Sequence, residues 1–282
     1  MPKSNKEWAW RITFDVACLL IVAAPLLVFY YAVEPFQRGF FCDDESIRHP
    51  YKADTVSTVA CYIVAVTLSV IMMSIVEYFH CKHCHRQKTM QVCCLHVHPW
   101  FWAIYSMVGV FAFGAACSQL ATDIGKYTIG RLRPHFITVC QPDFNKINCS
   151  GHAFIEDFEC LGDNVKAIRE ARLSFPSGHA SFSFYTMVYL ALYLQARLTW
   201  RATKLLRPFL QFICVMLCWY TALSRVSDYK HHPTDVLGGA VLGTVVAVVV
   251  AVYVSGMFKK RCAAADVQPP SRQNTIDNTD IP

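Results

Sequence analysis

Long apolar windows alternate with charged segments along the 282 residues of the chain. Six windows of 16 to 23 residues hold 118 residues in total, of which only Asp15 carries a formal charge. A helix needs about 17–25 residues to cross the ~30 Å hydrocarbon layer of a membrane, where the backbone must satisfy its own hydrogen bonds. The pattern therefore predicts an all-α, polytopic membrane protein with six transmembrane helices. They cover residues 14–33, 56–76, 101–121, 180–196, 208–223 and 236–258.

The composition agrees with this pattern and excludes several classes of protein. Hydrophobic residues make up 54% of the chain and charged residues 16%, so a soluble enzyme or a disordered chain is excluded. The first window is longer than the apolar region of about 7–15 residues in a signal peptide, so we expect it to be retained. The net charge is only +6, and no basic tract has interleaved aromatics, so no nucleic-acid partner is expected.

The sidedness of the loops follows from charge and from one sequon. Counting Lys and Arg gives 14 on the side of the termini and 12 on the other side, a small excess that favours cytosolic termini. Asn148 begins a glycosylation sequon in the loop 122–179, which is used only outside the cytosol. We expect a cytosolic segment 1–13, a six-span domain 14–258 and a disordered cytosolic tail 259–282. The expected location is the plasma membrane, with internal membranes and a lumenal site as the alternative.

Three blocks of ionisable residues lie at window boundaries on the outer side. Residues 126–134 follow the third window, residues 174–179 precede the fourth, and residues 224–235 join the last two. Because consecutive spans alternate in direction, these blocks lie on the same face and can converge at one depth. Cations, histidines and an aspartate that lie together at a membrane boundary indicate a functional site.

The residue types in these blocks favour phosphate chemistry. Lys126, Arg133 and Arg225 supply positive charge, and guanidinium groups match phosphate oxygens in a bidentate way. Ser177 and Gly178 precede a helix, whose first N–H groups and positive dipole end favour an anion. Each feature alone also has a plain alternative, because terminal cations anchor helices at the interface and Pro-Ser-Gly makes an ordinary capped turn.

Two histidines supply the groups that can exchange protons near neutral pH. His179 and His231 lie in different blocks, and Asp235 follows His231 by four residues. If the last helix begins near Pro233, Asp235 can face the imidazole ring of His231, fix its tautomer and stabilise its charged form.

The three blocks resemble the signature of the type 2 phosphatidic acid phosphatase superfamily. The motifs Lys126-x6-Arg133-Pro134, Pro176-Ser177-Gly178-His179 and Ser224-Arg225-x5-His231-x3-Asp235 carry this resemblance. The segment 35–42, the sequon and the segment 223–232 are similar to the animal lipid phosphate phosphatases within that superfamily. The resemblance covers roughly residues 14–258, and every signature position is filled.

The resemblance implies a role for each signature residue. His231 is expected to be the nucleophile that forms a phosphohistidine, with Asp235 orienting it and stabilising its charge. His179 is expected to protonate the departing alkoxide and then to activate water. The remaining positions are expected to hold the phosphate; they are Lys126, Arg133, Ser177, Gly178 and Arg225.

The resemblance also implies the substrates, which are phosphatidate, lysophosphatidate, ceramide 1-phosphate and sphingosine 1-phosphate in the bilayer. No cofactor or metal is expected, because three fixed cations can neutralise the developing charge and no acidic cluster typical of magnesium is present. Two alternatives stay open. One is a lipid phosphotransferase, and the other is a non-catalytic protein that binds or transports lipid phosphates. The oligomeric state, a homo-oligomer included, is also left open.

The fourteen cysteines divide by side. Cys42, Cys140, Cys149 and Cys160 lie in outer loops, where disulfides persist, and four cysteines allow three pairings. We prefer a bond between Cys149 and Cys160, which enclose a short segment. On the other side, four cysteines lie close to the membrane, and we leave open whether they are free, palmitoylated or bound to zinc. They are Cys81, Cys84, Cys93 and Cys94.

Overall fold

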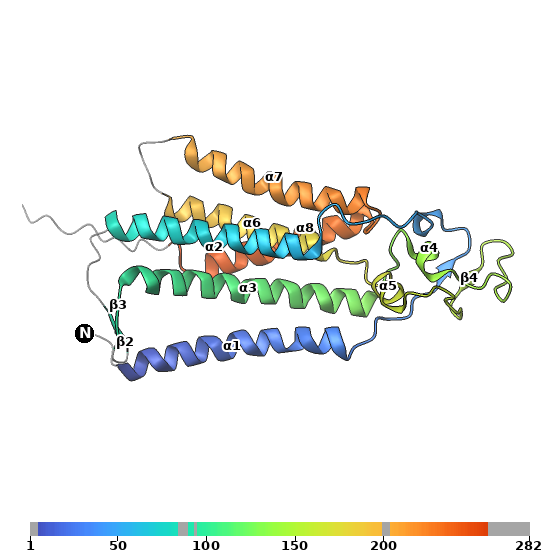
Figure 1. The fold of residues 1–282 in the computed structure, drawn as a ribbon, viewed down its shortest axis with the longest axis horizontal. Helices are drawn as coiled ribbons and strands as arrows, with labels where there is room; N and C mark the ends of the chain where they lie inside the picture. Colours follow the sequence, from blue (N-terminus) through green and yellow to red (C-terminus); the bar gives the residue numbers. More distant parts are fainter. Residues whose placement is uncertain (1–4, 84–89, 93–94, 199–203, 259–282) are drawn as a thin grey trace, which may run out of the picture.

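Six long helices run side by side in the computed structural model, which describes residues 5–83, 90–92, 95–198 and 204–258 (Figure 1). All six predicted windows fall on these helices, so the predicted helical architecture is confirmed. The bounds are α1 Asn5–Tyr31, α2 Thr58–His83, α3 Pro99–Ile129, α6 Gly178–Arg197, α7 Leu206–Ser227 and α8 Pro233–Val249, with a π-helical segment Val250–Val254 after α8.

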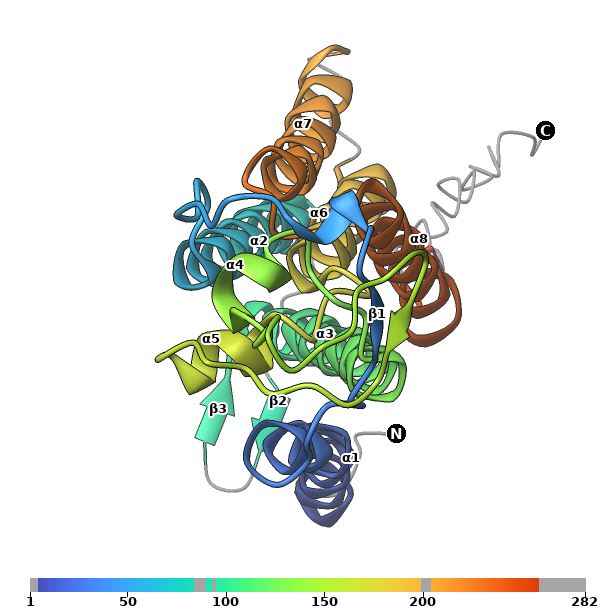
Figure 2. The ribbon, with the colours of Figure 1, turned by 90° about the vertical axis from the view of Figure 1, so that its right-hand side faces the viewer.

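Helix α6 lies at the centre of the bundle, with α2, α3, α7 and α8 around it (Figure 2). Most of its side chains are buried. The backbones of α6 and α8 approach closely, because a Cβ at Gly239 of α8 would lie 2.5 Å from the carbonyl oxygen of Ser177. Glycine is therefore required on this face of α8. In contrast, α1 lies at the edge of the bundle and packs along α3.

Five of the six helices are long and apolar enough to cross a membrane. They cover Trp8–Tyr31, Thr58–Lys82, Trp100–Ile129, Leu206–Ser227 and Pro233–Val254. The sixth, α6, is more polar, and its polar side chains form hydrogen bonds with α3. The Tyr185 hydroxyl donates to the carbonyl of Phe111 at 2.8 Å, and Ser181 and Thr122 share a hydrogen bond of 2.8 Å. The number of spans, predicted to be six, therefore stays a prediction.

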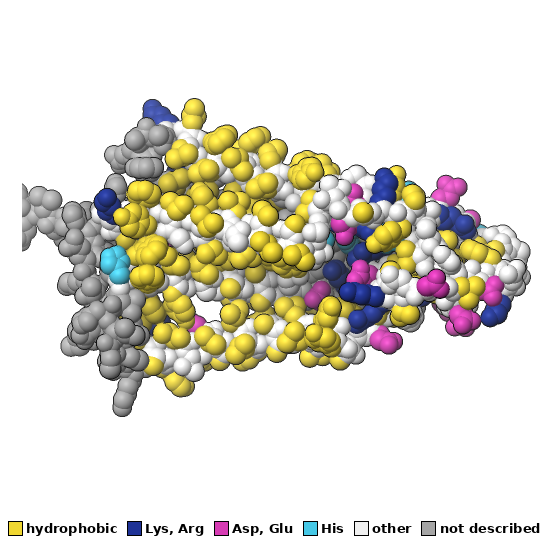
Figure 3. Space-filling model, in the orientation of Figure 1, with side chains coloured by type: hydrophobic (Ala, Val, Ile, Leu, Met, Phe, Trp, Pro, Cys, Tyr) yellow, Lys and Arg dark blue, Asp and Glu magenta, His cyan; other side chains and the backbone are white. Residues whose placement is uncertain are grey.

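Charged side chains gather at one end of the bundle, whereas hydrophobic side chains cover the visible sides of the helices (Figure 3). That end carries the segments 32–57 and 130–177 and the short loop between α7 and α8. We call these three segments the cap. It contains a 3-10 turn (Glu45–Ile47), the short helices α4 (Phe136–Cys140) and α5 (Val165–Glu170), and an antiparallel pair of strands, β1 (Phe40–Phe41) and β4 (Phe154–Ile155).

Two disulfides hold the cap together, and they correct the predicted pairing of Cys149 with Cys160. Cys42 is bonded to Cys149, and Cys140 is bonded to Cys160, with Cα–Cα distances of 5.6 and 4.7 Å. The β1–β4 pairing brings the first loop against the long one, because the amide of Cys42 donates to the carbonyl of Ala153. The long loop also folds back antiparallel at Cys140 and Cys160. Short sequence separation was therefore a poor guide to pairing.

The opposite end of the bundle carries the chain between α2 and α3, with the antiparallel strands β2 (Met90–Val92) and β3 (Leu95–Val97). Of the juxtamembrane cysteines, Cys81 lies near the end of α2. Cys84, Cys93 and Cys94 lie outside the described residues, as does the predicted tail 259–282.

Candidate active site

The second and third sequence blocks meet at the start of α6 and α8. The amide of Ser177 donates to the carbonyl of Asp235 at 3.0 Å, and the Ser174 hydroxyl donates to Oδ2 of the Asp235 carboxylate at 2.6 Å. The first block joins them through Lys126 in the last turn of α3: a Cβ at Gly178 would lie 2.9 Å from the Lys126 ammonium nitrogen. The predicted convergence of the three blocks is therefore present.

His231 lies just before α8 and is 4% exposed. Its Nδ1 atom is 2.7 Å from the carbonyl oxygen of Ser174. A carbonyl only accepts hydrogen bonds, so Nδ1 carries the proton and Nε2 of the neutral ring keeps its lone pair. Burial, together with the positive charges of Arg133 and Lys126, holds the pKa of His231 well below its ordinary value. The ring is therefore neutral and suited to act as a nucleophile through Nε2.

Asp235 occupies the first turn of α8 and is fully buried. Its carboxylate accepts hydrogen bonds from the Ser174 hydroxyl, from the amide of His232 at 3.0 Å and from the Arg131 guanidinium at 2.6 Å. Its Oδ2 atom lies 4.0 Å from Nδ1 of His231. This geometry corrects the sequence-based expectation in part, because the Ser174 carbonyl fixes the tautomer. Asp235 supplies negative charge beside the ring.

His179 is the second residue of α6, next to the Ser177 N-cap. Its Nε2 atom is buried and, among the described residues, has no hydrogen-bond partner. Its charge is among those that lower the pKa of His231. The Ser177 hydroxyl accepts from the amide of Ala180 at 3.5 Å. The Ser177 N–H, which we expected to be free for an anion, is instead used by Asp235.

Two of the three predicted phosphate-binding cations are unpaired. Within the described ranges, no hydrogen bond or ion pair engages the side chain of Lys126 or Arg133, and Nε of Arg133 is buried. Both side chains are partly exposed, and the charges of Asp123 on Lys126 and of Glu170 on Arg133 act from beyond ion-pair distance. These two cations, together with the unpartnered His179, make a site that is suited to an anion.

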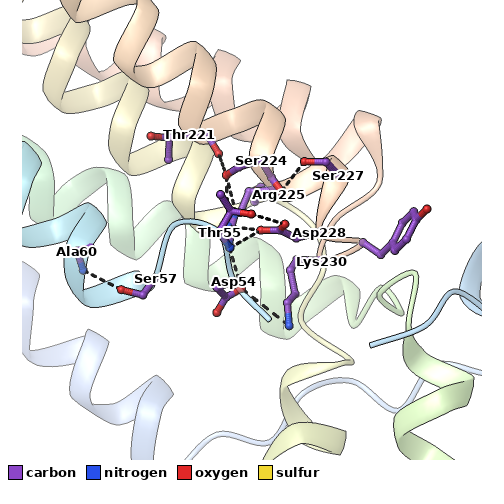
Figure 4. A network of polar contacts seen from close by, with 12 residues as sticks. Asp54, Thr55, Ser57, Ala60, Thr221, Ser224, Arg225, Ser227, Asp228 and Lys230 are labelled. Carbon is purple, nitrogen blue, oxygen red and sulfur yellow. Dashed lines mark hydrogen bonds and ion pairs between the residues drawn. The ribbon is translucent and has the colours of Figure 1, made fainter. Parts of the chain in front are cut away.

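Arg225, the third predicted cation, has carboxylate partners (Figure 4). It lies in the last turn of α7 and is 1% exposed. Its Nη1 atom is 2.9 Å from Oδ1 of Asp54, and its Nη2 atom is 2.8 Å from Oδ2 of Asp228. Arg225 therefore differs from Lys126 and Arg133, with which the sequence grouped it, in having carboxylate partners.

Several residues of this site were not predicted from the sequence. Ser174 and Arg131 lie inside the blocks that carry the signature, so their position was a usable signal. Asp228 lies inside the third block as well, whereas Asp54 and Thr55 gave no such signal, because the Asp54–Arg225 pair spans 171 positions. The predicted glycosylation residue Asn148 is exposed in the cap, beside the disulfide at Cys149. In the part of the chain that is described, no group of three or more His, Cys, Asp or Glu could hold a metal ion.

Comparison with known families shows which family the chain belongs to. The family model described as PAP2 superfamily matches residues 93–259, which is more than half of the chain. The chain belongs to the PAP2 superfamily. The matched range contains every predicted catalytic and phosphate-binding residue, and the resemblance inferred from the three motifs is confirmed.

Curated relatives extend the likeness beyond this range. A putative phosphatidate phosphatase of Drosophila melanogaster is 46% identical over 271 residues, which cover 91% of this chain and 72% of the relative. Phospholipid phosphatase 1 of Rattus norvegicus is 47% identical over 252 residues, covering 88% and 86%. Phospholipid phosphatase 2 of Homo sapiens is 42% identical over 259 residues, covering 91% and 86%. No solved structure matches the chain.

Proposed function

We propose that the chain is an integral-membrane lipid phosphate phosphatase that works through a phosphohistidine on His231. The observation that carries the proposal is a neutral, buried His231 beside His179 and two unpaired cations. Binding an anion without chemistry would need the cations alone, not a histidine whose tautomer is fixed. The names of the curated relatives support phosphatidate and other phospholipids as substrates.

In the first step, Nε2 of His231 attacks phosphorus and the bond from phosphorus to the lipid oxygen breaks. Lys126 and Arg133 neutralise the phosphoryl oxygens, and His179 gives its proton to the departing alkoxide. A bound phosphate favours the protonated form of His179 because it places negative charge beside the ring. The phosphohistidine ring is cationic, and Asp235 stabilises it from 4.0 Å while Nδ1 continues to donate to Ser174.

In the second step, water attacks phosphorus and the nitrogen–phosphorus bond breaks. His179, now neutral, takes a proton from the water, which returns both histidines to their starting states. Phosphate and a lipid alcohol are the products. No metal ion is needed in these steps, because the chain's own cations neutralise the transferred group.

We also propose that the chain spans the membrane six times, with the site on the extracellular or lumenal side. The site lies at the same end as two disulfides and the exposed Asn148, and disulfides persist in oxidising compartments. The acyl chains of a substrate would stay in the bilayer while the phosphate enters the pocket at its boundary. We place the protein in the plasma membrane or in internal membranes with a lumenal site.

The test is phosphate release by the purified full-length protein in lipid vesicles containing EDTA. The panel contains phosphatidate, lysophosphatidate, ceramide 1-phosphate and sphingosine 1-phosphate, with His231→Ala as the control. We expect phosphate and the matching lipid alcohol, identified by mass spectrometry. Transfer of the phosphoryl group to an added alcohol would instead establish a phosphotransferase, and activity that needs added magnesium would refute metal independence.

A further inference from the structure

Asp54 lies in the cap just before α2, and its carboxylate faces the cationic pocket. It is 2.9 Å from Nη1 of Arg225 and 3.8 Å from the ammonium of Lys230 (Figure 4). Burial lowers the pKa of Arg133, and the negative charges of Glu170 and Asp54 oppose that effect. The charge of Asp54 is therefore close enough to act on an unpaired phosphate-binding cation as well as on Arg225.

Asp54 differs from Asp228, the other carboxylate on Arg225. Asp228 is buried, and both of its oxygens accept from Thr55, at 2.6 Å from the hydroxyl and 2.8 Å from the amide. Asp54 is 38% exposed at its side chain, and its contacts within the described residues are the two cations. Asp228 is thus held by a fixed network, whereas Asp54 is a solvent-accessible anion at the edge of the pocket.

An incoming phosphate meets this carboxylate as a charge of the same sign. It also finds both terminal nitrogens of Arg225 paired with carboxylates, Nη1 with Asp54 and Nη2 with Asp228. A lipid phosphate has apolar chains that add binding energy outside the pocket, but free phosphate depends on the pocket alone. A carboxylate in this position weakens the binding of both phosphates by a similar factor, and the apolar chains offset that loss for the lipid but not for free phosphate.

We propose that Asp54 keeps the affinity of the site for free phosphate low by competing for Arg225 and repelling the anion. This inference rests on the proposed function, since free phosphate is a product of that reaction. The consequence is that phosphate leaves readily and does not block the next lipid.

The experiment uses Asp54→Asn in the full-length protein, with inhibition by inorganic phosphate and by orthovanadate as readouts. We expect both inhibition constants to fall on the order of tenfold, because one unit charge a few ångströms from the ligand is removed. Asp54→Glu keeps the charge and should keep both inhibition constants close to those of the parent protein. Glu45→Gln removes a charge from an exposed position in the same loop and should leave the constants unchanged.

A direct binding measurement covers the case in which the variant loses turnover. The rise in the midpoint of thermal unfolding on adding phosphate or vanadate should be larger for Asp54→Asn than for the parent. Unchanged or weaker binding in a folded Asp54→Asn protein would overturn the proposal and leave Asp54 as a positioning residue for Arg225. Tighter phosphate binding by Asp54→Asn, when the parent protein hydrolyses no lipid phosphate, would instead sink the proposed function and the role in product release, and would leave Asp54 only as a residue that weakens anion binding.

Discussion

Charged side chains lie near both ends of α6, which we call the outer end, at the cap, and the inner end, away from the cap, but their partners differ. At the inner end, Arg197 lies 3.7 Å from Glu77 of α2, Tyr193 donates to Glu77 at 3.0 Å, and Arg197 donates to Nε2 of His80 at 3.2 Å. At the outer end, Lys126 and Arg133 have no such partners among the described residues.

This difference separates a structural cluster from a binding site. Opposite charges a few ångströms apart neutralise each other in the interior, although Nε and Nη2 of Arg197 have no hydrogen-bond partner among the described residues, and removing one charge of such a pair is costly. On the proposed function, Lys126 and Arg133 gain a partner when a phosphate binds beside the two histidines. The comparison predicts that variants at the outer end change the chemistry, whereas variants at the inner end change stability. The predictions below are ordered by the free energy that we expect each to change.

His231→Ala should abolish turnover of every phosphate ester, because the covalent route is lost. Thermal unfolding should remain cooperative. His152→Ala, at an exposed histidine of the cap, is the matched control and should keep its turnover. Measurable phosphohistidine in the His231→Ala protein would place the nucleophile elsewhere and break the outer half of the comparison.

His179→Ala should lower turnover of lipid phosphates on the order of 10²–10⁴, the usual contribution of a general acid. An aryl phosphate such as p-nitrophenyl phosphate leaves as a stable phenolate and should escape most of this loss in the first step. The phosphohistidine should accumulate as an acid-labile adduct, measured after quenching. If the aryl substrate rescues His231→Ala instead, the two roles are reversed.

Glu77→Gln should cost roughly 3–5 kcal/mol of stability, because Arg197 is left buried without its counter-ion. We expect a lower midpoint of thermal unfolding in detergent and unchanged turnover per folded molecule. A Glu77→Gln protein with normal thermal stability and impaired turnover would show that the inner cluster takes part in the chemistry.

Arg133→Lys should lower kcat/KM on the order of 10–100-fold although the charge is kept, because bidentate contact with the phosphate is lost. Arg197→Lys makes the same exchange at the inner end and should leave kcat/KM near that of the parent protein. Equal losses in both variants, measured on folded protein, would contradict the distinction between the two ends.

The pH dependence of stability should report the buried His231. Its folded pKa lies below the ordinary value of about 6.5, so the unfolded chain takes up a proton first as the pH falls. The contribution of His231 to the free energy of unfolding is complete above about pH 6.5. It declines below that pH by at most about 1.4 kcal/mol per pH unit. The unfolding midpoint should therefore fall less between pH 7 and pH 5 in His231→Gln than in the parent protein.

The sequence was sufficient for the helices and for the meeting of the three blocks, because hydropathy and alternating direction determine both. It did not predict the partners of Arg225, since Asp54 comes from a loop whose docking depends on tertiary contacts such as that of Thr55 with Asp228. The predicted disulfide pairing was wrong for a similar reason, because the spacing of the cysteines does not reveal that β1 pairs with β4. The contact of His231 with the Ser174 carbonyl could not be predicted, because every residue has a backbone carbonyl and the residue type does not single one out.

The polarity of α6 has a consequence for how the protein is made. On the proposed six-span topology, the helix with the least apolar sequence leaves the ribosome after α2 and α3 but before α8, against which it packs closely. A segment rich in serine, threonine and tyrosine gains little by entering lipid alone. We therefore infer that α6 remains near the protein-conducting channel until α8 emerges and that the two partition together. Chains truncated between α7 and α8 should fail to retain α6 in the bilayer, and glycosylation reporters placed after α6 can measure this.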